Sequence, residues 1–354
     1  MLTTNEYLTP VLAEVCAALG LPGNDPALAG AARNKADMSR RFARCGVTAP
    51  STHSVATEDE LLRLRATGQL TYPSVNKPAD GAGSAGVTVV HSAAEAVSAM
   101  RAAREPRGMY GMPLDPRILV QEFAEGTEYS VESITQNGVS SHLCLTRKTV
   151  AGGAHRVELG HGLPAALPPE VETTVITQVE RAIAAVGIRN GASHTEVMLA
   201  PDGQCVVIEI GARLGAGQIG FLIAHALGVD PWAACLDVAL GRAVHLAPTR
   251  NGYAAVRFLT SPHPGRLASV TGLPLTSHRV PTVHMRKAIG DRVDDLPHNG
   301  ARLGYFVVTG PDADTVDAHA DDLFRQIRIE VVPHTHNQLG WGQVRPANTT
   351  AMSE

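Results

Sequence analysis

The stretch that most constrains the fold is 194–213, where two runs of apolar and β-branched residues flank the turn Pro201-Asp202-Gly203. Asp and Gly readily adopt the turn dihedrals that join antiparallel strands, so this stretch predicts a β-hairpin. If the loop contains only the Asp-Gly pair, counting outward places Glu196 directly opposite Glu209. The two carboxylates are then expected on one face of the sheet.

Two carboxylates at opposed positions, with Cβ atoms roughly 4.5–5.5 Å apart, repel each other unless a proton or a cation lies between them. Two hard oxygen ligands suit Mg²⁺ or Mn²⁺, and Mg²⁺ held by one or two carboxylates usually also binds substrate phosphates. Glu196 and Glu209 therefore favour nucleotide chemistry. The alternative is a pair of solvated acids on an exposed sheet face.

Composition excludes several classes of partner. With 354 residues the chain is long enough for two or three domains or subdomains. A net charge of −4 argues against nucleic acid or an anionic membrane as a partner. Aromatic residues make up only 4% of the chain, too few for a surface on which single-stranded bases stack.

The cysteines and the apolar runs bear on location. The five cysteines are scattered and form no C-x-x-C pair, which fits free thiols in a reducing compartment. The sequence has no apolar run of about 18 residues and no N-terminal signal pattern. We therefore expect a cytoplasmic protein with no membrane partner.

A glycine-rich loop lies between two β-rich runs, 72–78 and 87–90. The spacing Gly81-x-Gly83-x-x-Gly86 matches the dinucleotide fingerprint, but that motif requires a helix directly after the loop, and here a strand follows. A strand–loop–strand unit can fold over a triphosphate through backbone N–H groups, with Lys77 placing its ammonium against the phosphates. An ordinary turn is the alternative. A protein kinase is set aside because the chain lacks H-R-D and D-F-G.

Periodicity and capping signals predict the remaining elements. Helices are expected at 5–19, 33–45, 57–66, 168–186, 218–227, 230–240 and 311–328. Strands are expected at 116–123, 129–134, 139–148, 253–259, 266–270, 282–287 and 302–309. Residues 155–167 are interpreted as a loop that carries His161, and the chain beyond Pro333 as a disordered tail.

Several strings, in this order and spacing, resemble the ATP-grasp superfamily and within it the carboxylate–amine ligases that include L-amino acid ligases. They are Arg33-Asn34-Lys35, Val75-Asn76-Lys77-Pro78 with its glycine loop, Gln121 to Glu128, Gly160-His161-Gly162-Leu163-Pro164, the strands of Glu196 and Glu209, and Arg302-Leu303-Gly304-Tyr305. The resemblance runs from about residue 5 to about residue 310. It implies an α+β ATP-grasp fold, in which two α+β subdomains clamp a nucleotide, with a small C-terminal α+β unit.

The resemblance also implies a division of the chain. The expected parts are a remnant of an N-terminal domain (1–47), a lid subdomain with the glycine loop (48–122), a metal and nucleotide subdomain (123–250), a C-terminal α+β subdomain (251–333) and the tail (334–354).

Site roles follow from the resemblance position by position. Lys35 and Lys77 hold the phosphates of ATP, with Lys148 as a weaker candidate, and the loop with Gly81, Gly83, Ser84 and Gly86 closes over them. Glu122, Phe123 and Ala124 take the adenine edge, and Glu128 takes the ribose hydroxyls. Glu196 and Glu209 ligate Mg²⁺ or Mn²⁺, and Arg213 and His161 face the reacting phosphoryl and acyl groups.

Two departures from the family pattern stand out. Many members place Asn two residues after the second metal-binding Glu, where this chain has Gly211, so that water replaces a ligand or metal affinity is lower. The family also usually begins with a doubly wound domain of roughly 80–100 residues, whereas this sequence starts near that domain's expected end. The start is then either truncated or a variant, which bears on the substrate pocket.

The implied chemistry is phosphorylation of a substrate carboxylate by ATP, followed by attack of an amine on the acyl phosphate. The expected partners are small carboxylate and amine substrates such as amino acids; a homodimer is an option that the sequence does not decide. Two alternatives remain: another ATP-grasp reaction, such as carboxylation or formyl transfer in purine synthesis, and a non-catalytic nucleotide-binding protein.

Overall fold

A computed structural model describes residues 1–104, 114–261, 263–295 and 298–333. The predicted disordered tail, 334–354, lies outside these residues. An N-terminal group of short helices comes first. Its elements are η1 (Glu6–Leu8), α1 (Thr9–Ala18), α2 (Pro26–Ala29), η2 (Gly30–Ala32) and α3 (Lys35–Cys45).

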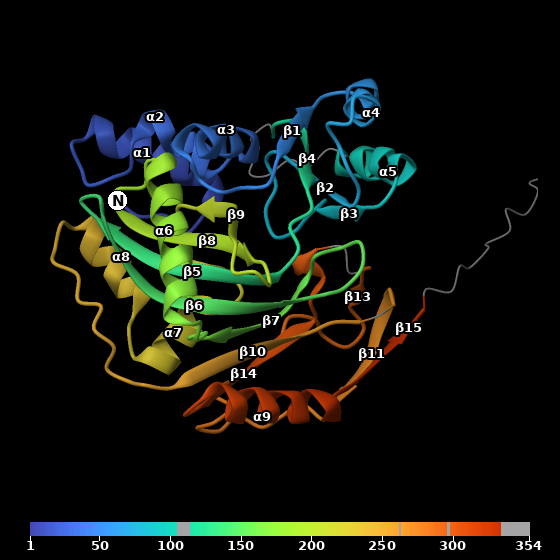
Figure 1. The fold of residues 1–354 in the computed structure, drawn as a ribbon. Coiled ribbons are helices and arrows are strands. Elements are labelled where there is room, and N and C mark those ends of the chain that lie inside the picture. The colour runs from blue at the N-terminus through green and yellow to red at the C-terminus, as the bar shows by residue number, and fades with distance from the viewer. Residues whose placement is uncertain (105–113, 262, 296–297, 334–354) are drawn as a thin grey trace, which may run out of the picture.

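The next part of the chain is a small α+β layer, called here the four-stranded unit (residues 52–122). It contains β1 (Thr52–Val55), α4 (Glu58–Ala66), β2 (Ser74–Pro78), β3 (Thr88–Val90), α5 (Ala93–Ala103) and β4 (Ile118–Glu122). The strands pair in the order β1-β4-β2-β3, and α4 and α5 pack together on their own apolar cluster. In Figure 1 this unit lies above one end of the larger sheet.

The larger sheet has eight strands, in the order β12-β14-β10-β7-β6-β5-β8-β9. They are β5 (Thr127–Gln136), β6 (Val139–Val150), β7 (Glu158–Leu163), β8 (Gly191–Leu199), β9 (Cys205–Gly211), β10 (Tyr253–Leu259), β12 (Thr282–Met285) and β14 (Gly304–Gly310). A smaller sheet pairs β13 (Arg292–Val293), β11 (Gly265–Thr271) and β15 (Arg328–Val332). The C-terminal part thus shares the central sheet and adds a small sheet of its own.

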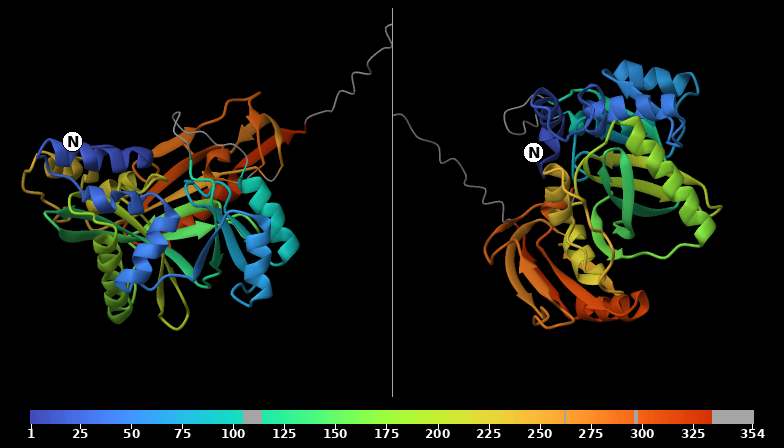
Figure 2. Two further views of the ribbon diagram at one scale, coloured as in Figure 1. Left: turned by 90° about the horizontal axis from the view of Figure 1, so that it is seen from above. Right: turned by 90° about the vertical axis from the view of Figure 1, so that its left-hand side faces the viewer.

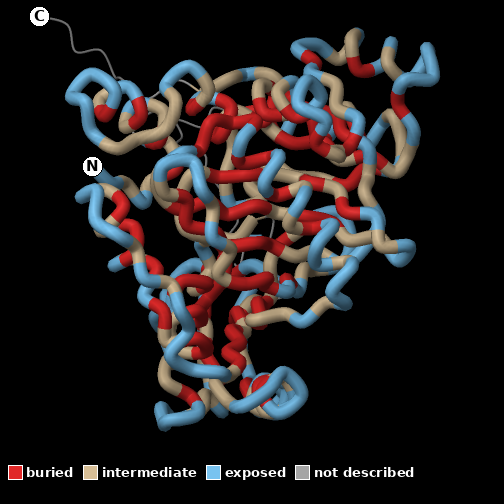
Figure 3. The backbone as a smooth tube through the Cα atoms, turned by 60° about the vertical axis from the view of Figure 1, so that its left-hand side comes forward, coloured by how far each residue is buried: buried red, intermediate tan, exposed pale blue. Residues whose placement is uncertain are grey.

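Helices cover both faces of the central sheet (Figure 2). On one face α6 (Pro169–Ala185) packs with α3 against β5, β8 and β9, and α9 (Ala313–Gln326) packs against β10 and β14. On the other face lie α7 (Ile219–Leu227) and α8 (Pro231–Ala239). Buried residues follow the strands through the middle of the molecule, and exposed residues collect on outer loops and helix ends (Figure 3).

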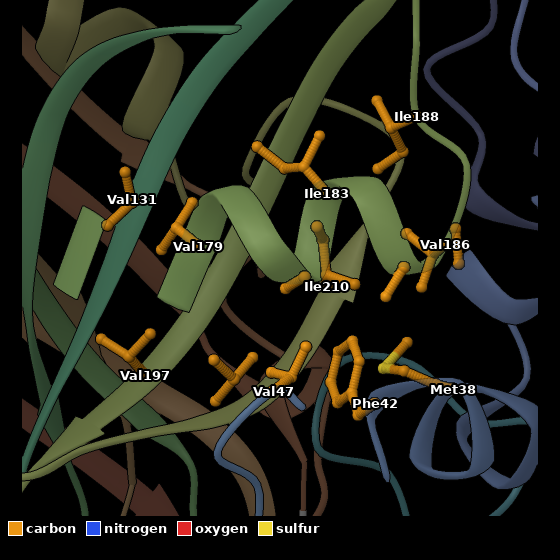
Figure 4. Close-up of a cluster of buried hydrophobic side chains, with 14 of the residues drawn as sticks. Met38, Phe42, Val47, Val131, Val179, Ile183, Val186, Ile188, Val197 and Ile210 are labelled. Carbon is orange, nitrogen blue, oxygen red and sulfur yellow. The ribbon is translucent and has the colours of Figure 1, made fainter. Parts of the chain in front are cut away.

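The core between α6 and the sheet fixes the hairpin of β8 and β9. Val179 and Ile183 of α6 lie in one buried cluster with Val197 of β8, Ile210 of β9 and Phe42 of α3 (Figure 4). Because side chains alternate along a strand, burying these residues turns their neighbours toward the opposite face. That opposite face carries the charged residues described below.

Side-chain caps fix where two helices begin. The Asn34 side chain accepts hydrogen bonds from the N–H groups of Ala36 and Asp37 and so begins α3 at Lys35, and Gly46 ends it with a positive φ of 67°. Thr57 caps α4 in the same way. The first lysine of the predicted site is therefore held at a helix N-terminus.

Two local predictions were wrong or incomplete. Residues 158–163, interpreted as part of a loop, form β7, because hydrogen bonding to β6 and β10 on both sides outweighs the weak strand propensity of its glycines. The strands β1, β13 and β15 were not predicted. In the part of the chain that the structure describes, no single helix is long and apolar enough to cross a membrane; α7 and α8 pass that test only as a pair bent by 105°.

Candidate functional site

A cavity lies between the four-stranded unit and the central sheet, on the face shared with α7. The charged residues that line it are Glu6, Lys35, Lys77, Glu122, Glu128, Lys148, Arg156, Glu158, Glu196, Glu209 and Arg213. Of the residues predicted for the site, all but Gly86 and His161 line this one cavity. Most of the predicted residues are thus brought together, although they come from distant parts of the chain.

The hairpin places Glu196 of β8 directly opposite Glu209 of β9, as predicted. The predicted two-residue turn is wrong: the Ala200 N–H donates to the Gln204 carbonyl at 2.9 Å, so three residues form the loop. This loop shifts the register by one residue, and a β-bulge at Ile208 shifts it back before Glu209. The bulge also lets two consecutive residues, Ile208 and Glu209, line the cavity.

Each of the two opposed carboxylates contacts a lysine. Glu209 Oε1 lies 2.8 Å from Lys35 Nζ, and Glu196 Oε1 lies 2.6 Å from Lys148 Nζ. Burial alone would raise the pKa of Glu196, but Lys148 and His194 hold it well below the ordinary value. Glu196 is therefore ionised, and each of the two carboxylates already has a lysine of the chain beside it.

Lys148 has the largest set of acidic partners in the cavity. Its Nζ lies 2.7 Å from Glu128 and 2.9 Å from Glu158, in addition to Glu196. Burial would lower the pKa of Lys148, but these three carboxylates raise it well above the ordinary value. Lys148, predicted only as a weaker phosphate candidate, thus occupies the centre of the charged cluster.

Lys77 differs from the other two lysines. Only 4% of its surface is exposed, and among the described residues its Nζ makes no hydrogen bond or ion pair. Burial lowers its pKa to about 8. A buried cation without an acidic partner in a cavity is expected to bind an anion.

The glycine loop lines the same cavity. Gly83 and Ser84 have positive φ angles of 63° and 60°, a conformation that costs little for Gly and more for Ser. The Gly81 carbonyl accepts a hydrogen bond from Lys35 Nζ at 2.6 Å. Gly86, also at positive φ, ends the loop without lining the cavity.

Part of the cavity lining is apolar. It includes Val75, Val87, Val89, Met198 and Ile208, together with Phe123 and Ala124 of the predicted base-binding crossing. Glu122 lines the cavity as well, but its backbone N–H already donates to the Ser51 carbonyl at 2.9 Å. The cavity therefore combines apolar side chains, suited to a flat ring, with cationic side chains, suited to phosphates.

Arg213 and His161 are placed differently. Arg213 lines the cavity, and its Nε donates to Glu6 Oε2 at 3.0 Å. His161 is only 1% exposed and lies behind the cavity, where its ring meets Phe258 edge-on and its Nε2 is 3.6 Å from Glu158. A Cβ on Gly217 would come within 2.4 Å of His161 Nε2, so the loop at Gly217 covers the imidazole.

Sequence reasoning missed several charged residues of the site. His194 Nδ1 lies 2.6 Å from the buried Glu132, and His194 Nε2 lies 3.3 Å from Glu196. Burial would lower the pKa of His194, but Glu132 and Glu196 raise it to about 9. His194 stands two residues before Glu196 in the same strand, so both side chains lie on one face of the sheet. This spacing could have identified His194 as a site residue.

No such pattern in the sequence identifies Glu6 or Glu158 as a site residue. Glu6 is buried against Arg213 from an N-terminal helix, and Glu158 begins β7, which was not predicted. Burial opposes ionisation of Glu6, but Arg213 and Lys35 keep its pKa below the ordinary value. Only the tertiary structure brings these carboxylates into the site.

The residues present fit a divalent metal that shares its coordination with a substrate. In the described ranges no group of three His, Cys, Asp or Glu side chains could hold a metal by itself. Two opposed carboxylates beside cationic side chains suited to phosphates match the way Mg²⁺ binds, with few protein ligands, several waters and substrate phosphates. Gly211 contributes no ligand, although a Cβ there would meet nothing closer than 3.7 Å.

Comparison with known families agrees with this geometry. Residues 70–221 match the model of the ATP-grasp domain, and residues 257–332 match the model of the L-amino acid ligase C-terminal domain 2. The chain therefore contains an ATP-grasp domain, and the predicted α+β ATP-grasp fold is confirmed. The second match groups its C-terminal domain with that of the L-amino acid ligases.

Individual relatives support that grouping. Dapdiamide A synthase from Enterobacter agglomerans is 32% identical over 252 residues, which cover 68% of this chain and 58% of the relative. Alanine–anticapsin ligase from Bacillus subtilis is 27% identical over 252 residues, which cover 67% of this chain and 52% of the relative. The chain thus spans little more than half the length of these two relatives.

The structural comparison concerns the fold alone. The crystal structure of an L-amino acid ligase from Bacillus licheniformis superposes with a TM-score of 0.77 and 23% identity, covering 94% of this chain and 80% of that one.

Proposed function

We propose that this protein is an ATP-dependent carboxylate–amine ligase that joins an amino acid or small carboxylate to an amine, releasing ADP and phosphate. The acid is phosphorylated by the γ-phosphate of ATP, and the amine then attacks the acyl phosphate to form an amide. The names of the relatives, an amino-acid ligase among them, support this substrate class. Five free cysteines are consistent with a cytoplasmic location, which we also propose.

The observation that carries the proposal is the opposition of Glu196 and Glu209 beneath the glycine loop, with three lysines in the same cavity. Phosphoryl transfer requires positioning and charge neutralisation more than a nucleophilic side chain. Lys35 and Lys77 would neutralise phosphate oxygens. Phe123, Ala124 and Ile208 would hold the base, and Glu128 the ribose.

Glu196 and Glu209 would hold Mg²⁺ or Mn²⁺, which supplies further charge neutralisation when bound together with ATP. Arg213 would stabilise the negative charge on the substrate oxygens, an effect typically worth on the order of 10²–10³ in rate for one donor. The closed glycine loop would exclude water from the acyl phosphate. His161, which lies behind the cavity, reaches the reacting groups only if the loop at Gly217 moves.

A hydroxylamine trap with ATP, Mg²⁺ and each amino acid tests the proposal. We expect hydroxamate and ADP to form with at least one amino acid, and a coupled screen of amino acid pairs then to give an amide of matching mass. The Glu209→Gln variant should stay folded and lose turnover. ATP binding without hydroxamate for any acid would favour the non-catalytic alternative, and ADP release with purine precursors only would favour the other ATP-grasp reactions.

A further inference from the structure

The short helix η3 (Asn299–Ala301) of the C-terminal part contacts the glycine loop. The Asn299 backbone N–H donates a hydrogen bond to the Gly83 carbonyl at 3.1 Å. Asn299 also lines the cavity, and a Cβ on Gly83 would lie 4.0 Å from the Asn299 Cβ. The loop thus contacts an element that no site prediction included.

The Asn299 side chain is itself held by Glu158. The Glu158 backbone N–H donates to Asn299 Oδ1 at 3.0 Å, and Asn299 Nδ2 donates to Glu158 Oε2 at 3.0 Å. These two hydrogen bonds fix the side chain from both directions. They also hold the N-terminal residue of η3 in place, which keeps its N–H directed at the loop.

Glu158 connects this contact to the charged cluster. Arg302 donates to the Glu158 carbonyl at 3.0 Å and to Glu158 Oε2 at 2.7 Å, while its guanidinium lies 3.7 Å from the centre of the Phe258 ring. The other carboxylate oxygen, Oε1, lies 2.9 Å from Lys148 Nζ. A continuous set of contacts therefore runs from Gly83 through Asn299 and Glu158 to Lys148.

We propose that Asn299 is a positioning residue that holds the glycine loop closed over the cavity and ties it, through Glu158, to Lys148. The C-terminal part then completes the nucleotide site instead of only flanking it. The identity of the nucleotide rests on the proposed function, but the contact itself does not. The direct contact is one backbone hydrogen bond. Its loss should raise the fraction of molecules with an open glycine loop about fivefold, and the loop should still close reversibly.

A matched pair of variants separates the two parts of this contact. Asn299→Ala keeps the backbone N–H and loses the bonds to Glu158, whereas Asn299→Pro loses the N–H as well. Proline is tolerated at this first helical position because the preceding His298 is extended, with φ −158° and ψ 162°. Asn251→Ala, on an exposed residue distant from the cavity lining, is the control.

The measurement is the release rate of a fluorescent, non-hydrolysable ATP analogue bound with Mg²⁺. We expect release to be faster in Asn299→Ala and about fivefold faster again in Asn299→Pro, with thermal unfolding unchanged and the control like the unchanged chain. Equal release rates in the two Asn299 variants, or rates equal to that of the unchanged chain, would overturn the proposal.

A disulfide trap tests the contact without nucleotide. The Cβ separation between positions 83 and 299 falls within the range of disulfides, so Gly83→Cys with Asn299→Cys should cross-link on oxidation. Exposed Cys45 is replaced by Ser, and Gly83→Cys alone serves as the control. We expect the oxidised protein to bind the analogue at least tenfold more slowly and reduction to restore binding.

The disulfide trap distinguishes a failure of the Asn299 proposal from a failure of the proposed function. Failure to cross-link, or cross-linking that leaves analogue binding unaffected, overturns the role of Asn299. If the unchanged chain binds no ATP analogue at all, the proposed function fails, and rapid cross-linking would still support the contact between η3 and the loop.

Discussion

At the scale of residues, the described part of the site contains two lysines that pair with carboxylates and a third, Lys77, that does not. Lys35 and Lys148 each contact a carboxylate, whereas Lys77 has no such partner among the described residues. Keeping a buried ammonium without a partner is unfavourable in the empty protein. Such a residue is retained where binding of an anion offsets that cost.

Lys77→Met should therefore stabilise the nucleotide-free protein and weaken ATP binding. Burial lowers the Lys77 pKa from 10.5 to about 8, which corresponds to about 3 kcal/mol of folding free energy at pH 7 as an upper bound. Because the folded-state pKa lies below the unfolded value, this cost is fully present below pH 8. It disappears as the pH rises from about 8 to 10.5.

Urea unfolding at pH 7 and at pH 9.5 measures this effect. The stability gain of Lys77→Met over the unchanged chain should be larger at pH 7 than at pH 9.5, and Lys287→Met, outside the cavity, should show no such difference. A loss of stability in Lys77→Met at pH 7 would mean that the ammonium has a favourable partner in the empty protein.

Gly211 offers a second prediction at this scale. It lies two residues after Glu209 on β9, and an added Cβ would make only ordinary contacts with Arg213, at 3.7 Å or more. Gly211→Asn should add an oxygen ligand and tighten Mn²⁺ binding in the presence of ATP by roughly tenfold. Gly211→Ala, which adds bulk without an oxygen, should leave Mn²⁺ binding unchanged in an electron paramagnetic resonance titration; equal affinities for the two variants would exclude Asn as a ligand here.

At the scale of elements, the β-bulge in β9 has a specific consequence for the site. It lets both Ile208, an apolar residue, and Glu209, a charged one, line the cavity, although adjacent residues in a regular strand face opposite ways. One strand thus serves both the base and the metal of the proposed ATP complex.

Ile208→Ala should accordingly weaken binding of the base and spare binding of the phosphates. Loss of its apolar contacts is expected to reduce ATP affinity roughly tenfold, from about 1–2 kcal/mol of buried apolar surface. Affinity for Mg²⁺–tripolyphosphate, which has no base, should stay the same. Calorimetric titration with both ligands checks this, and an equal loss for both would place Ile208 at the phosphates instead.

Local signals account for what could be predicted from the sequence. The capping box at Thr57 located α4, and the acidic hairpin located Glu196 and Glu209. Glu196 and Glu209 were correctly predicted to be opposed, but from an incorrect turn. The longer loop shifts the register by one residue, and the bulge shifts it back. Neither the loop length nor the bulge has a signal in the residue pattern.

Long-range contacts account for what could not be predicted. β7 is a strand only because it pairs on both sides, and Asn299 reaches the glycine loop from a distant part of the chain. No periodicity in the sequence records such contacts.

At the scale of the whole molecule, the cavity is built by every part of the described chain. Lys35 comes from the N-terminal helices, Lys77 from the four-stranded unit, Glu196 from the central sheet and Asn299 from the C-terminal part. The division into parts with separate roles, including a lid over the nucleotide, remains our proposal. A site assembled this way can open and close as its parts move, which suits an enzyme that protects an acyl phosphate from water.

The central claim is that this cavity transfers phosphate from ATP to a carboxylate oxygen. Its most direct test uses the amino acid found by the hydroxylamine screen, labelled with ¹⁸O in its carboxylate, together with ATP, Mg²⁺ and the amine. After one round of ligation, mass spectrometry of the released phosphate should show one ¹⁸O atom per phosphate, transferred from the acid. Unlabelled phosphate, formed alongside amide, would show that the acid was not activated as an acyl phosphate and would contradict the account.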